Sequence, residues 1–130
     1  MAVLIDTSVL VAQERGRLRL VELIRPHQQY AISVITAAEL IHGVHLTDGA
    51  RAQQRSAFVE KLLAAFSALP VDLFVARAYG RLSAALAVAG ASVNSSDLWI
   101  GATAIAHGLE VLALDGDSDR IPGVRRASVD

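Results

Sequence analysis

Apolar positions along this chain fall into short continuous runs that alternate with longer helical stripes. The first run, Ala2–Ile5, predicts a buried strand. Asp6 and Thr7 follow it as a polar turn that can cap a helix. This helix is expected to be interrupted near Gly16 and to end before Pro26.

The same alternation continues to the end of the chain. The other predicted strands are residues 30–34, 69–71 and 111–114, with residues 125–128 as a candidate fifth strand at the edge. The other predicted helices run from a cap at Thr36 to about His45, over residues 51–66, from a cap at Asp72 to Gly90, and over residues 97–107 with Gly108 as the C-cap. Strands alternating with helices indicate one domain, residues 1–130, built as a three-layer α/β sandwich around a central, mainly parallel sheet of four or five strands.

The composition limits the kinds of cross-link, metal site and membrane segment that this domain can contain. The 130 residues are 53% hydrophobic and include no cysteine, so disulfides and thiolate metal sites are excluded. The longest uncharged stretch lies between Arg81 and Asp97 and is shorter than the roughly 20 apolar residues of a membrane span. No basic segment precedes the apolar start, as a secretory signal requires. We therefore expect a cytoplasmic protein without a membrane partner.

The basic residues are almost all arginine. The net charge is −1, so no overall field attracts nucleic acid, but Lys61 is the only lysine among twelve basic residues. Arginine presents a planar fork suited to phosphate. Arg77 and Arg81, one helical turn apart and opposite an apolar stripe, are candidate substrate-binding residues, and so is the cluster Arg15, Arg17 and Arg19. The alternative is a solvated charged face.

Acidic residues stand at the ends of predicted elements. They are Asp6 after the first strand, Glu39 in an otherwise apolar helix, Asp97 at the start of a buried helix, and Asp115 after the fourth strand with Asp117 and Asp119 beside it. The carboxyl ends of parallel strands meet at one edge, so we expect these acids to converge. Crowded carboxylates oppose folding unless a cation intervenes, and all-oxygen ligands suit Mg²⁺ or Mn²⁺. The alternative is that each acid is a helix cap or a solvated charge.

Four ordered motifs carry a resemblance to a known family. They are residues 4–10, Ala38-Glu39-Leu40 with Gly43, residues 96–104 and residues 111–117. Together they resemble the four acidic motifs of PIN domains and span the whole chain. The length and single-domain organisation resemble the VapC type of toxin.

The resemblance implies a PIN fold, a homodimer and Mg²⁺-dependent endoribonuclease activity on RNA. It also implies a cognate VapB-type antitoxin whose tail blocks the acidic pocket. Carried over by position, the residues that ligate metal directly or through water are Asp6, Glu39, Asp97 and Asp115, with Asp117 as an accessory acid. Thr7 or Ser8 is expected to orient Asp6 or a water, and the metal centre to activate water for in-line attack on a phosphodiester.

The chain departs from the family pattern at three positions. Ala113 stands where threonine is frequent, Ser118 where phenylalanine is frequent, and Gly101 where alanine is usual. Trp99, beside Asp97, is expected to pack in the core or at a dimer interface rather than to stack on a base.

Other functions have weaker support in the sequence. Within the fold, the alternative is a non-catalytic PIN-type subunit of a DNA-binding repressor complex. A phosphorylatable receiver domain needs an acidic pair after its first strand, and here Thr7 follows Asp6. A phosphatase with Asp-x-Asp fails at Ser8, and Glu39 with His42 forms only one copy of the Glu-x-x-His spacing that di-iron bundles need twice.

Overall fold

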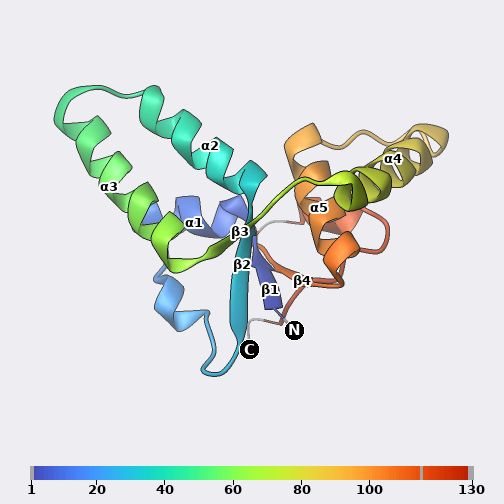
Figure 1. Ribbon diagram of the computed structural model, residues 1–130, viewed down its shortest axis with the longest axis horizontal. Coiled ribbons are helices and arrows are strands. Elements are labelled where there is room, and N and C mark those ends of the chain that lie inside the picture. Colours follow the sequence, from blue (N-terminus) through green and yellow to red (C-terminus); the bar gives the residue numbers. More distant parts are fainter. Residues whose placement is uncertain (1, 115, 129–130) are drawn as a thin grey trace.

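A sheet of four parallel strands forms the centre of the molecule (Figure 1). The computed structural model describes residues 2–114 and 116–128, and of Asp117 only the backbone. In the order β3-β2-β1-β4, the strands are β1 (Ala2–Ile5), β2 (Gln29–Ser33), β3 (Ser67–Leu69) and β4 (Glu110–Leu112). The predicted central parallel sheet is confirmed, and the four carboxyl ends lie at the same edge.

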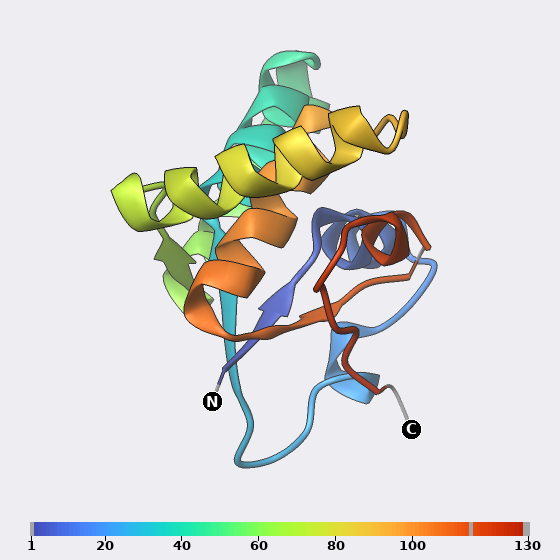
Figure 2. The same cartoon turned by 90° about the vertical axis from the view of Figure 1, so that its right-hand side faces the viewer.

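Five α-helices in the described part of the chain cover the two faces of this sheet. They are α1 (Thr7–Glu14), α2 (Val34–His45), α3 (Gly49–Ala65), α4 (Leu73–Val88) and α5 (Ser95–His107). The first three lie on one side of the sheet and α4 and α5 on the other (Figure 1), which is the predicted three-layer arrangement. Figure 2 shows α4 crossing α5. None of the described helices is long and apolar enough to cross a bilayer.

Successive side chains of β1 enter different cores. Val3 and Ile5 pack in the core beneath α1, α2 and α3. Leu4 points to the opposite face and packs against Ile100 and Ala104 of α5. Because neighbours along a strand face opposite sides, a strand covered on both faces is apolar throughout. This explains the unbroken apolar run at the start of the sequence.

The helices on the second side begin and end at residues suited to those positions. Asp72 accepts a hydrogen bond from the Val75 amide at 3.0 Å and caps α4, as predicted. Asn94 caps α5 through the Ser96 amide at 2.8 Å. Gly108 ends α5 with φ +67°, a left-handed conformation that glycine adopts without steric cost.

Helix α2 begins earlier than the sequence predicted. Ser33 is its cap, and its Oγ accepts a hydrogen bond from the Ile35 amide at 3.0 Å. Thr36, the predicted cap, lies inside the first turn and is fully buried. The prediction is wrong because both residues carry a hydroxyl that can cap, and the end of β2 at Ser33 selects the first of them.

Other boundaries also differ from the prediction. Strand β3 starts two residues earlier than predicted, and residues 125–128 contribute only an isolated parallel bridge between Arg126 and Val111. Helix α1 ends at Glu14, and a short 3-10 helix, η1 (Leu20–Glu22), follows the turn at Gly16. Gly16 has φ +71°, so the chain reverses there and the predicted interruption is confirmed.

Trp99 is part of the packing between the two outer helices. Its ring stacks on Tyr79 of α4, with 3.7 Å between ring centroids and 18° between ring planes. Both side chains pack against the core formed by α4, α5, and Ile121 and Val124, which follow a second 3-10 helix, η2 (Asp117–Arg120). The expected core packing of Trp99 is therefore observed.

Candidate functional site

A pocket of about 620 Å³ opens at the carboxyl edge of the sheet. Three carboxylates from three separate elements line it: Asp6, Glu39 and Asp97. The other lining residues are Thr7, Ser8, Val11, Ala12, Arg15, Arg17, Leu18 and Leu114. Glu39 and Asp97 are 58 residues apart in the sequence, yet they face the same space.

Asp6 is placed by the central strand. It follows β1 directly, and its backbone amide donates to the carbonyl of Leu112 at 2.9 Å, which extends the pairing with β4. Its Oδ2 accepts a hydrogen bond from the Ser8 amide at 3.1 Å and caps α1. Asp6 is therefore both a cap and a wall of the pocket, and the two interpretations of the sequence are compatible.

Glu39 is held by two hydroxyl groups. Thr7 Oγ1 donates to Glu39 Oε1 at 2.8 Å, and the same Thr7 oxygen lies 3.0 Å from Thr36 Oγ1. A hydroxyl has one proton to donate, so when Thr7 donates to the carboxylate, Thr36 donates to Thr7. The resulting chain Thr36–Thr7–Glu39 joins α1 to α2 and fixes one carboxylate oxygen.

Asp97 enters the pocket from the opposite side of the sheet. It lies in the first turn of α5 and is half-buried, while Asn94 makes the cap hydrogen bond. Asn94, and not Asp97, is therefore the N-cap residue of α5. A carboxylate at this position interacts favourably with the positive end of the helix dipole.

The fourth acidic segment is only partly described. Asp115 and the side chain of Asp117 lie outside the described residues. Before them, the Leu114 amide donates to Ser8 Oγ at 3.3 Å, so Ser8 ties this segment to α1 beside Asp6. After them, Asp119 forms an exposed ion pair with Arg126 at 3.4 Å.

The three carboxylates of the pocket have the chemistry that a hard cation prefers, but they are not close enough together to surround one. Within the described residues, no three carboxylate or imidazole side chains come close enough together to hold a metal ion. The three lining acids are nevertheless half-buried, supply only oxygen, and face one water-accessible space. Mg²⁺ retains several waters and needs one or two direct carboxylates, so this chemistry fits that ion.

The arginines that lie beside the acids are not Arg77 and Arg81, the pair spaced one helical turn apart. Arg15 and Arg17 line the pocket. Arg77 and Arg81 lie on the exposed face of α4, and the described lining of the pocket does not include them. Their role in substrate binding stays a prediction.

Sequence reasoning missed Thr36 as part of the site. It is three residues before Glu39, and residues at this spacing share one face of a helix. The sequence did contain a signal for this role. Thr36 places a hydroxyl on the same helix face as Glu39, and most of the other residues of that face are apolar.

Comparison with known proteins identifies the same organisation. The family model described as PIN domain matches residues 3–124. "Ribonuclease VapC5" of Mycobacterium tuberculosis is 41% identical over 127 residues, which cover 96% of this chain and 91% of that protein. "Ribonuclease VapC4" of the same organism is 34% identical, with 93% and 92% covered.

Solved structures agree with the sequence relatives. The crystal structure of VapBC-5, a member of the VapBC family of toxin–antitoxin systems from Mycobacterium tuberculosis, matches with a TM-score of 0.78 and 36% identity, covering 97% of this chain and 98% of that chain. VapBC2 from Rickettsia felis, bound to a DNA fragment from the promoter, matches with a TM-score of 0.88 over all of both chains. Its identity is 23%, so it supports the fold alone.

Proposed function

This chain belongs to the PIN-domain family, and on that premise we propose that it is a VapC-type endoribonuclease toxin that hydrolyses RNA phosphodiesters in its acidic pocket. The observation that carries the proposal is the pocket itself, in which Asp6, Glu39 and Asp97 face one space from β1, α2 and α5. Relatives named as ribonucleases cover more than nine-tenths of this chain. The two hydroxyls of the pocket already hold structural hydrogen bonds, Thr7 with Glu39 and Ser8 with the Leu114 amide, so we propose water rather than a side chain as the nucleophile.

We assign metal binding to the acids of this pocket. The proposed ligands, direct or through water, are Asp6, Glu39 and Asp97, which line the pocket, together with Asp115 and Asp117, which are included by sequence position alone. Mg²⁺ is the proposed ion, with Mn²⁺ as an alternative, because hard cations prefer oxygen ligands. When bound, such an ion stabilises the negative charge that develops on the phosphate and lowers the pKa of a coordinated water.

The protein side chains have separate tasks in this proposal. Thr7 orients Glu39 by its hydrogen bond, and Ser8 orients Asp6 through its amide and the fourth acidic segment through its hydroxyl. A water attacks phosphorus in line with the bond that breaks, a pocket carboxylate accepts the water proton, and the leaving oxygen is protonated from solvent. Arg15 and Arg17, in the same pocket, are placed to contact non-bridging phosphate oxygens.

An antitoxin partner belongs to the same proposal. The VapBC complexes named above are toxin–antitoxin assemblies of proteins that share this fold. A VapB-type antitoxin that covers the acidic pocket would keep RNA out of it. A homodimer is a further expectation, supported by Leu73, Phe74 and Val88 on α4, which expose 67%, 60% and 90% of their surfaces. Sedimentation of the purified chain tests it, and a monomer at high concentration contradicts it.

Cleavage of RNA by matched acid-to-amide variants tests the central assignment. Asp6→Asn keeps an N-cap of nearly equal strength, so α1 should form normally. We expect Asp6→Asn and Asp97→Asn to abolish cleavage in Mg²⁺, and EDTA to abolish it in the unmodified protein. Full activity in EDTA or in either variant defeats the assignment. Metal binding without cleavage of any RNA favours the non-catalytic repressor subunit instead.

A further inference from the structure

A second cavity lies next to the acidic pocket and shares Arg15 with it. This cavity, of about 370 Å³, is lined by Glu14 and Arg15 from the end of α1 and by Arg51, Gln54, Arg55 and Phe58 from α3. Arg15 also lines the acidic pocket. The two cavities are therefore neighbours on either side of one arginine side chain, and a chain-like ligand could occupy both. We name the second one the basic cavity.

The α3 wall of the basic cavity is a single helical stripe. Its residues stand at positions 51, 54, 55 and 58, which is the spacing i, i+3, i+4, i+7 of one helix face. Phe58, at the far end, packs against the core beneath the sheet. Phe58 therefore packs in the core at one end of the stripe, and Arg51 and Arg55 lie nearer the other end, where the cavity is also lined by Glu14 and Arg15 of the α1 terminus.

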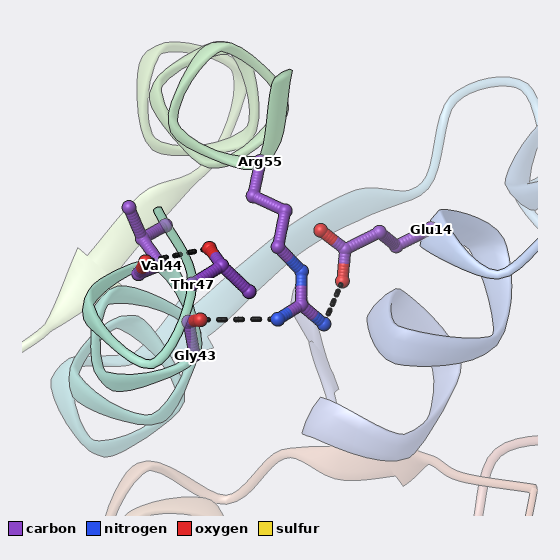
Figure 3. Close-up of polar contacts among 5 residues, drawn as sticks. All are labelled: Glu14, Gly43, Val44, Thr47 and Arg55. Carbon is purple, nitrogen blue, oxygen red and sulfur yellow. Dashed lines mark hydrogen bonds and ion pairs between the residues drawn. The ribbon is translucent and has the colours of Figure 1, made fainter. Parts of the chain in front are cut away.

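Arg55 holds this wall in place. Its Nη1 donates to the carbonyl of Gly43 at 3.0 Å, and its Nη2 donates to Glu14 Oε1 at 3.4 Å (Figure 3). The two charged side chains are only 24% and 17% exposed. Figure 3 also shows the Thr47 hydroxyl on the carbonyl of Val44 at 2.8 Å, which secures the end of α2 beside this contact. Arg55 therefore joins α3 to α1 and α2, and its charge is balanced by Glu14.

The other two arginines remain available to a ligand. Arg15 and Arg51 are exposed, and neither side chain makes a hydrogen bond or an ion pair with any residue that the structure describes. Three arginines and one glutamate line the cavity, which leaves an excess of two positive charges. This excess lies directly beside a pocket that carries three carboxylates.

We propose that the basic cavity is a subsite that binds a backbone phosphate of the RNA strand adjoining the phosphate that is cleaved. The inference rests on the proposed endoribonuclease function. A net charge of −1 gives the protein no general attraction for RNA, and the acidic pocket repels it, so productive binding needs cations placed next to the acids. Arginine forks match phosphate oxygens, and a strand with one phosphate at the acids carries the next phosphate one nucleotide away.

An acidic segment of a protein partner is the competing occupant. It would also be attracted by Arg15 and Arg51, but it has no requirement to enter the adjoining carboxylate pocket. A nucleic-acid strand cleaved there must leave the pocket in some direction, and Arg15 marks the boundary between the two cavities. The shared wall therefore favours RNA.

The test measures the salt dependence of RNA binding. Arg51→Gln is placed in the non-cleaving Asp97→Asn protein, and the affinity for a fluorescein-labelled single-stranded RNA is measured by anisotropy in MgCl₂ across a NaCl series. Loss of one phosphate contact lowers the slope of log K against log[NaCl] by about 0.7 and weakens binding several-fold at low salt. The matched control is Lys61→Gln, an exposed cation ten residues further along the same helix, roughly 15 Å away. It should leave the slope unchanged.

Each result decides between the occupants. Equal slopes for Arg51→Gln and Lys61→Gln overturn the proposal, and so does a loss of affinity in Arg51→Gln for a poly-glutamate peptide with RNA binding intact. Failure of the unmodified protein to cleave any RNA instead overturns the endoribonuclease function itself, while cleavage by the Asp97→Asn protein at the unmodified rate overturns only the assignment of Asp97. If Asp97→Asn is inactive and Arg51→Gln has no effect on RNA, only the subsite is wrong. Thermal unfolding of Arg51→Gln should match that of the unmodified protein, since the side chain makes no described contact.

Discussion

Thr7 donates its hydroxyl proton to Glu39 at 2.8 Å, and this hydrogen bond links the first helix of the chain to the acid of the second. The donor is itself supported by Thr36, whose oxygen lies 3.0 Å away and is fully buried. A carboxylate held in this way keeps one orientation without a ligand. The relationship makes Thr36, which faces no solvent, a positioning residue for the pocket.

Replacement of Thr36 by valine should therefore weaken the response to metal more than it weakens the fold. Thr36→Val keeps the shape and removes the hydroxyl, so Thr7 loses its donor and Glu39 gains rotational freedom. We expect the Mg²⁺ concentration for half-maximal cleavage to rise several-fold. The free energy of unfolding should fall by about 1 kcal/mol, the value of one net hydrogen bond.

Thr103→Val is the matched control for this prediction. Thr103 is also fully buried in a helix, but its hydroxyl donates to the Trp99 carbonyl at 2.9 Å and does not line the pocket. It should lose a similar amount of stability without a change in Mg²⁺ dependence. If both variants change that dependence equally, the hydroxyl chain has no special role.

Metal should stabilise the fold through the acidic pocket. Three carboxylates facing one space repel each other, and a bound divalent ion relieves this repulsion. A ligand that binds only the folded state at 100 times its Kd adds about 2.7 kcal/mol. We expect thermal unfolding to shift upward with MgCl₂ in the unmodified protein, and much less in Asp97→Asn. An equal shift in both proteins would place the ion elsewhere.

Gly101 lies against the side chain of Ile121, which leaves little room for a larger residue. A Cβ at Gly101 would lie 2.9 Å from Ile121 Cδ1, and 3.3 Å from both Ile121 Cγ2 and Val124 Cγ2. Gly101→Ala should destabilise by about 1 kcal/mol, since overpacking costs roughly 1–3 kcal/mol and the better helix propensity returns about 1. Ile121→Val removes the closest atom, so in urea unfolding the double variant should be more stable than the sum of the two single changes predicts. Strict additivity would contradict the contact.

Ser118 is a site where stability can be gained. Its Oγ is buried and has no hydrogen-bond partner among the residues that the structure describes. Ser118→Ala removes an unsatisfied polar atom, which should raise the free energy of unfolding by about 1 kcal/mol. Ser95→Ala, at an exposed position in the first turn of α5, should change it by less. A loss of stability in Ser118→Ala would indicate that the hydroxyl has a partner in the acidic segment next to it.

The convergence of the acids was predictable, because it follows from topology. Asp6 comes directly after an apolar run, and any parallel α/β sheet brings such positions to one edge. Asp97 was predicted for the same edge from its place in the N-terminal turn of its helix. The boundaries of α2 were not predictable, since Ser33 and Thr36 are equivalent as caps until the end of β2 is known.

The sequence named two candidate groups of arginines, and spacing alone could not decide which of them reaches the pocket. Arg77 and Arg81 form a regular pair on a helix, which is visible in sequence, yet they face solvent on α4. Arg15 and Arg17 reach the pocket because the chain reverses at Gly16, and the direction of a chain after a turn depends on tertiary packing. The stripe at positions 51–58 was visible as a helix face, but its partner on α1 was not.

The order of the strands in space has a consequence for how the protein is made. Strand β1 is synthesised first and pairs with β4, one of the last elements, while Asp97 lies in α5, the helix directly before β4. A nascent chain whose α5 and β4 have not yet left the ribosome carries Asp6 and Glu39 in the folded part, but Asp97 is not yet beside them. The proposed acidic pocket is therefore incomplete until α5 and β4 have been synthesised and have docked on the sheet.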